Sequence, residues 1–260
     1  MNHNNAILIL SCDKYSDLWD PFFELFRKNW SDCPYQIYLG SNQIKYGRYE
    51  EVRNILTGTD VDWSTSFRKI LEQIPEEYIF VWLEDIFITA KMPTGIFESV
   101  FRFMAERGAN HIHFRPVPKT KNNIENNTYG VYEKQMPYKV NLVGFWKKEY
   151  LLKLLLSGEN AWNFEIFGSY RASFDSGFYC LNNQLFDFIN IIDKGSWIPA
   201  SLKYCDVNGI KLEVGKRKQI KHATKAFFIL KNSCFKIVSL VNWKFRVRLM
   251  NILRKLIISY

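Results

Sequence analysis

Short apolar runs alternate with amphipathic segments along the first part of the chain. Near-continuous apolar runs are typical of strands buried on both faces, and the segments between them repeat apolar residues at helical spacing. This alternation predicts an α/β fold with a mostly parallel central sheet covered by helices. The predicted strands are residues 5–11, 35–42, 77–83 and 110–116, and the predicted helices are residues 19–30, 62–74 and 93–107.

The pattern changes after Pro118. Residues 119–137 are polar and rich in Asn, which predicts a mobile loop or a hairpin. The periodicity then predicts a strand over residues 138–146 and helices over residues 147–158 and 161–174. Residues 186–200 are predicted to be a strand that leads into a turn at Gly195. We therefore expect one α/β domain over residues 1–215, followed by a tail over residues 216–260.

The net charge of +9 belongs to the tail. Residues 211–260 hold 13 of the 35 Lys and Arg residues and one of the 26 acids, Glu213. Apolar residues recur there at helical spacing between the basic ones, which predicts an amphipathic helix on an anionic membrane surface. The preceding domain shows no recognised nucleic-acid module, so we expect no nucleic-acid partner. No apolar stretch approaches the ~18 residues of a membrane span.

The cysteines and the first apolar run bear on the compartment. Five cysteines are widely spaced without a C-x-x-C pair, which favours neither a disulfide framework nor a zinc site and fits a reducing compartment. The first apolar run is too short for a signal peptide and is interpreted as a strand. We therefore expect a cytoplasmic location.

Polar side chains follow the predicted strands where these end. Ser11 and Asp13 follow the first strand, Asn42 follows the second, and Glu84 and Asp85 interrupt a long apolar run. Open α/β sheets bind ligands at the carboxyl ends of their strands, so we expect these residues to share a site. Neither the glycine-rich dinucleotide fingerprint nor a phosphate-binding P-loop is present, and a nucleotide must be held in another way.

Adjacent acids in an apolar run need an explanation, because an ionised carboxylate is costly to bury unpaired. Either a solvated turn begins at Glu84, or a positive group lies nearby. Mg²⁺ or Mn²⁺ takes oxygen ligands and shares its shell with phosphates, so Asp85 could clamp a diphosphate through such an ion. The turn Asp62–Trp63–Ser64 begins a predicted helix, and a helix N-terminus favours an anion; ordinary capping explains these residues equally well.

Several segments, taken in order, resemble a family of bacterial polysaccharide glycosyltransferases of O-antigen and capsule synthesis. They are "LILSCDKYSDLWDPFFELFRKNWSDCPYQIYLGSN", "GTDVDWSTSFRKILEQIPEEYIFVWLEDIFI", "NFEIFGS" and "DKGSW", spread over residues 5–215. The order of these motifs is more specific than any one of them. The resemblance implies a GT-A-like fold, in which a single α/β domain over residues 1–215 binds a nucleotide sugar and an acceptor.

The resemblance also implies roles at the strand ends. In the GT-A fold an acidic D-x-D motif after a central strand holds the donor diphosphate through a metal ion. The motif here departs from that pattern, since Glu84 and Asp85 are adjacent, and Asp85 is the better metal or ribose ligand. Ser11 and Asp13 would lie beside the nucleoside of a UDP-linked donor, and Asn42 would close the pocket.

Inverting transfer needs a carboxylate that takes a proton from the acceptor hydroxyl as this attacks the anomeric carbon. Glu165, within "AWNFEIFGS", is the candidate base and Asp175 is the runner-up; the structural alternative for Glu165 is a first-turn helix acid. Lys194 would neutralise the leaving diphosphate, or is a solvent-facing loop lysine. His111 and His113 share one face of a strand and could bind a metal, but without a suitably spaced third ligand a structural role is favoured.

These features together predict an inverting glycosyltransferase that acts on a lipid-linked glycan at the cytoplasmic face of the membrane. Two alternatives belong to other classes. A sugar-phosphate nucleotidyltransferase should show a glycine-rich basic loop after its first strand, and the segment "SCDKYSD" contains no glycine. A non-catalytic glycan-binding or scaffold protein would keep the aromatic residues and would bind no nucleotide.

Overall fold

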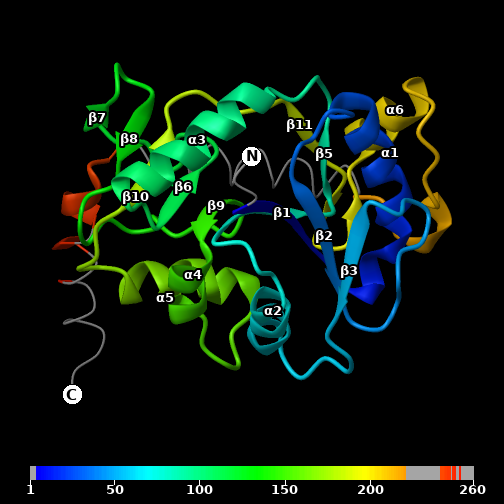
Figure 1. Cartoon of the computed structure of the whole chain (residues 1–260), viewed down its shortest axis with the longest axis horizontal. Coiled ribbons are helices and arrows are strands. Elements are labelled where there is room, and N and C mark those ends of the chain that lie inside the picture. The colour runs from blue at the N-terminus through cyan, green and yellow to red at the C-terminus, as the bar shows by residue number, and fades with distance from the viewer. Residues whose placement is uncertain (1–3, 221–240, 247, 250–251, 253–260) are drawn as a thin grey trace. The chain divides into compact units, whose positions relative to one another are not determined.

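The computed structural model describes residues 4–220, 241–246, 248–249 and 252. The chain forms two compact units, residues 1–218 and 219–260. Among the described residues, the first unit contains a nine-stranded sheet and two small two-stranded sheets (Figure 1). The strands of the large sheet are β1 (Asn5–Leu10), β2 (Gln36–Ser41), β3 (Val52–Leu56), β4 (Tyr78–Leu83), β6 (His111–His113), β7 (Asn123–Ile124), β8 (Tyr129–Val131), β9 (Gly144–Lys147) and β10 (Phe178–Leu181).

The large sheet has the order β3-β2-β1-β4-β9-β6-β10-β8-β7. Strands β3, β2, β1 and β4 are parallel, and β9 is antiparallel to both β4 and β6, so β6 runs in the direction of β4. Only β8 and β9 oppose the other seven strands of this described sheet. The predicted α/β class with a mostly parallel central sheet is therefore confirmed.

Helices cover both faces of the sheet, as the side chains of β9 illustrate. Phe145 packs against Phe101 of α3 at 5.0 Å between ring centroids, and Trp146 points to the other face against Phe164 of α5 at 6.2 Å. Helices α2 and α4 lie with α5 on that second face (Figure 1). The helices are η1 (Asp13–Leu18), α1 (Trp19–Asn29), α2 (Trp63–Glu72), α3 (Thr94–Arg107), α4 (Lys148–Leu154), α5 (Ala161–Arg171), α6 (Pro199–Val207) and η2 (Val214–Lys216).

The second half of the domain differs from the predicted elements. The strand predicted over residues 138–146 is shorter and begins only at Gly144. The strand predicted within residues 186–200 is divided into β11 (Phe188–Asn190) and β12 (Ile192–Asp193), with β13 (Ser196–Trp197) after the turn, and β11 pairs with β5 (Ile86–Ile88). The predicted turn is present at Lys194 and Gly195, whose φ angles of 47° and 76° turn the chain back into a tight hairpin.

Two strands of the large sheet, β3 and β10, have weak sequence signals. In β3, Val52 and Ile55 are buried while Arg53 and Leu56 are exposed, the alternating pattern of an edge strand.

The Asn-rich segment after Pro118 forms the hairpin of β7 and β8, and the predicted hairpin is confirmed there. Its turn contains residues 125–127, all at positive φ, which Asn tolerates better than most residues.

The predicted tail is described only in part. The boundary between the two units follows Lys218, so residues 216–218 belong to the α/β unit. Most of the helix predicted over residues 216–260 lies outside the described residues. Within the described part, Val241, Phe245 and Leu249 are exposed at successive helical turns. No helix among the described residues is long and apolar enough to cross a membrane.

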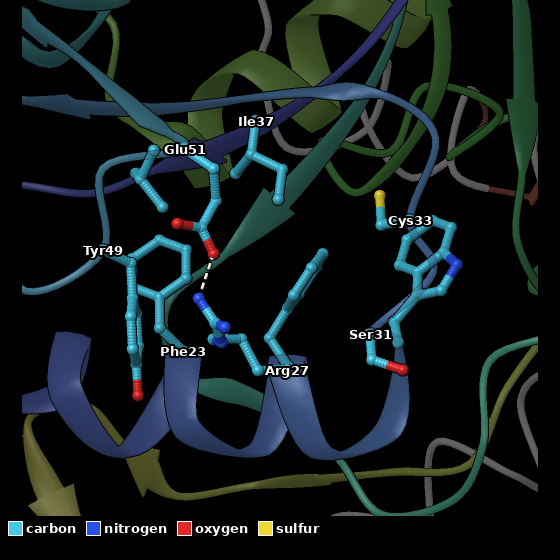
Figure 2. Close-up of a pocket in the computed structure, with 10 residues that line it drawn as sticks. Phe23, Arg27, Ser31, Cys33, Ile37, Tyr49 and Glu51 are labelled. Carbon is cyan, nitrogen blue, oxygen red and sulfur yellow. Dashed lines mark hydrogen bonds and ion pairs between the residues drawn. The ribbon is translucent and has the colours of Figure 1, made fainter.

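A cavity of about 110 Å³ lies between α1 and the strands β2 and β3 (Figure 2). The side chains of Arg27 and Glu51 form an ion pair across it, and Cys33 lies at one end. Burial raises the pKa of the Cys33 thiol to about 12, which makes the thiol unreactive. The cavity lies where β2 and β3 begin, at the edge of the sheet opposite to the strand ends considered next.

Candidate active site

The order of the first strands reverses direction at one edge of the sheet. The chain passes from β1 outward to β2 and β3, and then returns to place β4 on the other side of β1. In open α/β sheets ligands bind outside the carboxyl ends of the strands at such a reversal. The register pairs Leu10 with Leu83, so Ser11 and Glu84 leave the sheet side by side. Ser11 and Glu84, two of the predicted donor-binding residues, therefore lie side by side at the reversal point.

Glu84 and Asp85 form the tight turn between β4 and β5. Glu84 is only 6% exposed, whereas Asp85 is half-buried. The backbone carbonyl of Asp85 accepts a hydrogen bond from the N–H of Ile191 at 2.9 Å, which holds the segment between β11 and β12 against the turn. Glu84 and Asp85 therefore lie in a turn, as the first of the two explanations predicted. The rest of the protein, however, covers most of this turn.

Burial dominates the electrostatics of the two acids. It raises the pKa of Glu84 well above its usual range, and the adjacent charge of Asp85 raises it further. Burial also raises the pKa of Asp85 to about 6, and the carboxylate of Asp193 contributes in the same direction. Near neutral pH the structure favours a protonated Glu84 beside an ionised Asp85. Asp85 is therefore the acid available to a cation or a ribose.

Arg217 is the positive group near these acids, and sequence reasoning had assigned it to the tail. Its guanidinium donates to the carboxylate of Asp17 at 2.9 and 2.5 Å and to the carbonyl of Lys14 at 2.9 Å. The side chains of Arg217 and Asp17 are only 7% and 3% exposed. The charge of Arg217 lowers the pKa of Glu84 and of Asp85 against the effect of burial.

The contacts of Arg217 join segments that lie far apart in the sequence, so no local pattern predicts its position. The guanidinium lies 4.7 Å from the ring centroid of Tyr15 and 5.8 Å from that of Trp197. Lys218 accepts a hydrogen bond from the backbone N–H of Trp197 at 2.8 Å, which fastens this segment to the β12–β13 hairpin. The pairing with Asp17 joins residues 200 positions apart, a distance over which no sequence motif operates.

Hydrogen bonds join Asp13 and Asn42 to each other. The carboxylate of Asp13 accepts hydrogen bonds from the backbone N–H groups of Asn42, Gln43 and Ile44 at 3.0–3.1 Å. The side-chain oxygen of Asn42 in turn accepts from the N–H of Asp13 at 3.2 Å. Ser11 accepts a hydrogen bond from the indole of Trp19 at 2.8 Å. Asp13 and Asn42 thus join the ends of β1 and β2, which would form the floor of a ligand site there.

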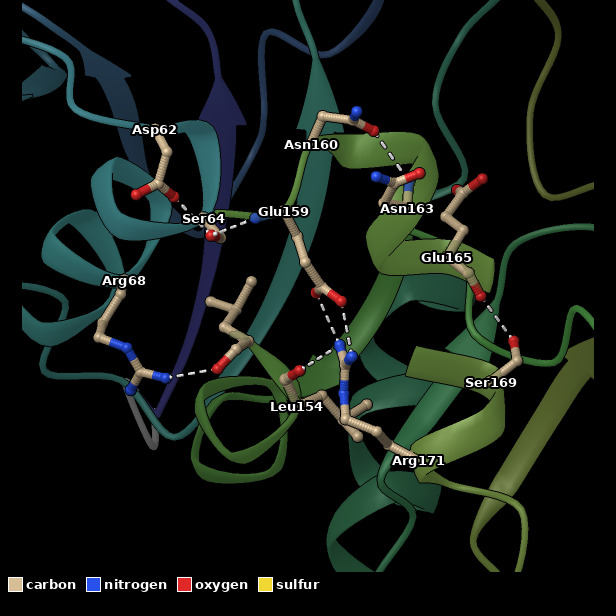
Figure 3. A network of polar contacts seen from close by, with 11 residues as sticks. Asp62, Ser64, Arg68, Leu154, Glu159, Asn160, Asn163, Glu165, Ser169 and Arg171 are labelled. Carbon is tan, nitrogen blue, oxygen red and sulfur yellow. Dashed lines mark hydrogen bonds and ion pairs between the residues drawn. The ribbon is translucent and has the colours of Figure 1, made fainter. Parts of the chain in front are cut away.

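The turn Asp62–Trp63–Ser64 caps α2. The Asp62 carboxylate accepts from the hydroxyl of Ser64 at 2.6 Å and from the backbone N–H of Thr65 at 2.9 Å. These hydrogen bonds hold the pKa of Asp62 below its usual range. The hydroxyl of Ser64 also accepts from the N–H of Glu159, and Trp63 contacts Phe164 at 5.7 Å (Figure 3). The turn therefore acts as a helix cap, and it also joins α2 to the segment that leads into α5.

Glu165 reaches the same edge of the sheet as Asp85. One oxygen of its carboxylate accepts a hydrogen bond from the backbone N–H of Leu142 at 2.9 Å. Strand β9 pairs Gly144 with Val81, so two residues earlier Leu142 lies level with Leu83. The other carboxylate oxygen makes no hydrogen bond within the described residues, and in Figure 3 the carboxylate points away from the rest of the network. It is free to accept a proton from a ligand.

Glu165 has the ionisation behaviour that a general base requires. Burial raises the pKa of its carboxyl, while the Leu142 N–H and the charge of Arg115 lower it. The helix α5 that carries Glu165 is fixed by a bidentate pair between Arg171 and Glu159, at 2.7 and 2.8 Å (Figure 3). A base needs such a rigid support, because its reach to the acceptor is set by the scaffold.

The structure separates Asp175 from the other acids. Asp175 precedes β10 at the edge of the sheet where β4 begins, opposite to Glu84 and Asp85. Its carboxylate accepts a hydrogen bond from the Tyr150 hydroxyl at 2.5 Å and pairs with Lys153 at 3.7 Å. The prediction that Asp175 could serve as the base beside Asp85 is therefore not supported by its position.

Lys194 and the two histidines take different places. Lys194 is exposed at the tip of the β12–β13 hairpin, directly after Asp193, whose charge acts on Asp85. His111 and His113 are buried within β6, and His111 stacks on Trp146 at 4.0 Å between ring centroids. Among the residues that the structure describes, no group of three or more His, Cys, Asp or Glu side chains is arranged to hold a metal ion.

Comparisons with known proteins give partial likenesses. No protein-family model matches the chain, and no curated protein is similar in sequence. Among solved structures, S. aureus TarS 1–349 in complex with UDP-GlcNAc is 11% identical, with a TM-score of 0.42 over 71% of this chain and 60% of that one. The chain therefore spans less than two thirds of the length of this TarS structure.

Two further structures show a likeness of the same degree. The bifunctional IspDF from Campylobacter jejuni is 13% identical, with a TM-score of 0.41 over 69% of this chain and 50% of that one. A protein from Desulfovibrio desulfuricans G20, assigned as a nucleotide-diphospho-sugar transferase, is 7% identical, with a TM-score of 0.41 over 69% of this chain and 79% of that one. Since each TM-score is below 0.5, the function proposed below rests on the residues of the site.

Proposed function

We propose that the protein is a glycosyltransferase that uses a nucleotide-sugar donor. The observation that carries this proposal is the position of Asp85 and Glu165 at one edge of the sheet, although 80 positions separate them in sequence. Asp85 stands at the strand reversal, where a nucleotide is expected, and Glu165 stands beyond β9 with a free carboxylate oxygen. Sugar transfer needs a carboxylate that helps to hold the donor and a base that takes the proton from the acceptor hydroxyl.

The donor would lie across the ends of β1 and β4. Its nucleoside, which we take to be uridine, would rest against Ser11 and the floor formed by Asp13 and Asn42. Its diphosphate would extend toward Asp85 and the exposed Lys194. Glu84 would keep the turn in place, since it is nearly fully buried.

A divalent cation fits this arrangement. Asp85 is half-buried and ionised near neutral pH, and Asp193 lies close enough to raise its pKa. Mg²⁺ commonly takes one or two protein carboxylates and completes its shell with substrate phosphates, and Mn²⁺ prefers the same oxygen ligands. Asp85, with Asp193 beside it, would hold the ion, which when bound supplies positive charge to the diphosphate.

Glu165 would act on the acceptor. As the acceptor hydroxyl oxygen forms a bond to the anomeric carbon, the bond from that carbon to the diphosphate oxygen breaks, and the hydroxyl proton passes to Glu165. The nucleoside diphosphate leaves with the bonding electrons. Attack from the face opposite to the leaving group inverts the anomeric centre.

The test of the proposed function is nucleotide binding. A panel of nucleoside diphosphates, each with and without Mn²⁺, should raise the melting temperature with UDP plus Mn²⁺, because a ligand that binds only the folded state stabilises it by RT ln(1 + [L]/Kd). At a hundredfold excess over Kd the gain is about 2.7 kcal/mol. A panel in which no nucleotide shifts the melting temperature would contradict the proposal and favour a non-catalytic glycan-binding protein.

We also propose that the acceptor is a lipid-linked glycan of a surface polysaccharide and that the tail binds the inner face of the membrane. The support is the charge of residues 211–260 and the exposed Val241, Phe245 and Leu249 at helical spacing. Such a helix can lie in the interface, with its basic residues toward anionic lipid. Each Lys or Arg near that surface contributes about 1 kcal/mol.

Liposome co-sedimentation tests this attachment. The full chain should sediment with anionic vesicles, part of it should be released at high salt, and a chain that ends at Ile220 should stay in solution. The shortened chain keeps Arg217 and the whole first unit, so its UDP response should be unchanged. Equal sedimentation with neutral and anionic vesicles, or no loss on truncation, would mean that the tail binds something other than anionic lipid.

A further inference from the structure

Arg115 lies at the edge of the sheet that carries the candidate site, yet neither the donor nor the base described above uses it. Strand β6 pairs His113 with Gly144 of β9, so two residues further Arg115 lies level with Leu142. Leu142 is the residue whose N–H holds the carboxylate of Glu165. Arg115 therefore stands beside the candidate base and across β9 from the end of β4.

The guanidinium of Arg115 has no hydrogen-bond partner or ion pair among the described residues. Its Nε is buried without a partner, although the side chain as a whole is half-buried. The ring centroids of Phe114 and Phe188 lie 5.4 and 5.5 Å from its guanidinium carbon. A buried N–H group normally has a hydrogen-bond partner, so the open Nε–H of Arg115 requires an explanation. An anionic ligand would provide it.

The charges around Arg115 show which part of the site such a ligand would occupy. The charges that act on Asp85 are those of Asp193 and Arg217. Arg115 acts instead on Glu165, and Glu165 acts on it in return. Arg115 thus belongs to the part of the candidate site where the acceptor would bind, rather than to the part where the diphosphate would bind.

We propose that Arg115 binds an acidic group of the acceptor, and that the acceptor is therefore an anionic sugar. This inference rests on the proposed function. The planar guanidinium can donate two parallel hydrogen bonds to a carboxylate or a phosphate, and these charge-assisted bonds are about twice as strong as neutral ones. An acidic group held there would bring a neighbouring hydroxyl toward the free oxygen of Glu165.

The first experiment uses the full chain and three simple sugar derivatives in the presence of UDP and Mn²⁺. Methyl glucuronide supplies a carboxylate, glucose 6-phosphate supplies a phosphate, and methyl glucoside is the neutral control; binding is measured by ligand-observed NMR titration. We expect at least one acidic sugar to bind about 10- to 100-fold more tightly than the neutral one. The stronger of the two identifies carboxylate or phosphate as the group that is bound. Equal affinities for all three would overturn the proposal.

The second experiment assigns that preference to Arg115. Arg115→Gln should remove it, and Arg115→Lys should retain only part of it, because an ammonium keeps the charge but lacks the planar pair of donors. Arg102→Gln is the matched control, since Arg102 is exposed on α3 away from the strand ends. A full preference for acidic sugars in a folded Arg115→Gln protein would overturn the assignment.

Failure of this inference and failure of the proposed function give different results. The thermal shift with UDP and Mn²⁺ is measured on the same variants, and neither Arg115 variant should change it. If UDP binds and no acidic sugar is preferred, the acceptor inference fails alone. If an acidic sugar is preferred but no nucleotide binds, the anion site stands and the proposed transferase function fails.

Discussion

Replacement of Asp85 by Asn should lower sugar transfer by about 10²–10³-fold or abolish it, the range found when a group that stabilises developing charge is lost. The melting temperature at pH 7 should not fall. Burial raises the pKa of Asp85 to about 6, so the folded state holds its ionised form at a cost, and the neutral amide removes that cost. Transfer from a UDP-sugar and thermal unfolding measure the two effects.

The neighbouring acid provides an internal comparison. Glu84→Gln should reduce transfer less, because burial favours a protonated Glu84 that already resembles the amide. Asp32→Asn, at an exposed turn after α1, should leave both activity and stability unchanged. Full activity in a well-folded Asp85→Asn protein would rule out its role at the donor. A marked loss of stability in that variant would mean that Asp85 serves the turn.

Replacement of Glu165 by Gln should reduce kcat by about 10²–10⁴-fold, as expected for a lost general base. The affinity for UDP should change little, because Glu165 is held by Leu142 beyond β9 while the nucleotide is expected between β1 and β4. Glu149→Gln is the matched control, since that side chain is 87% exposed on α4. If UDP affinity falls together with kcat, Glu165 contacts the donor or supports the fold.

The pH dependence of kcat gives a second view of Glu165. A general base works only when deprotonated, so kcat should fall as the pH drops through the pKa of Glu165. Burial raises that pKa, and the acidic limb should therefore lie above the ~4.3 of an exposed glutamate. The residual activity of the Glu165→Gln protein should lose the limb that Glu165 contributes and keep only the one that Asp85 contributes near its pKa of about 6. An unchanged limb in that protein would assign the titration to another group.

Local pattern determined much of the first half of the domain. The runs that became β1, β2 and β4 are apolar nearly throughout, and such runs are stable only as strands covered on both faces. The helix α2 begins at an Asp62 cap, as its sequence predicts. Because parallel strands end at one edge, the meeting of Ser11 with Glu84 also follows from the alternation of strands and helices.

Local pattern failed where long-range pairing decides the structure. The strand predicted before the turn at Gly195 forms two short strands with different partners, since β11 pairs with β5 across 100 positions of sequence and β12 pairs with β13. The edge strand β3 carries polar residues that weaken its signal. Asp175 looked similar to Glu165 in sequence, but the direction of β10 places it at the opposite edge of the sheet.

The sequence by itself determined the α/β class, the acids at the end of a buried strand and the separation of a basic tail from a nearly neutral domain. These properties reside in neighbouring residues, whose apolar periodicity and charge can be counted along the chain. The tertiary structure alone decided that Glu165 reaches the edge of the sheet that holds Asp85 and that Arg217 returns to pair with Asp17. It also decided that the buried Nε of Arg115 has no partner among the residues that the structure describes. Those outcomes depend on strand order, strand direction and register, which bring together side chains that no local signal connects.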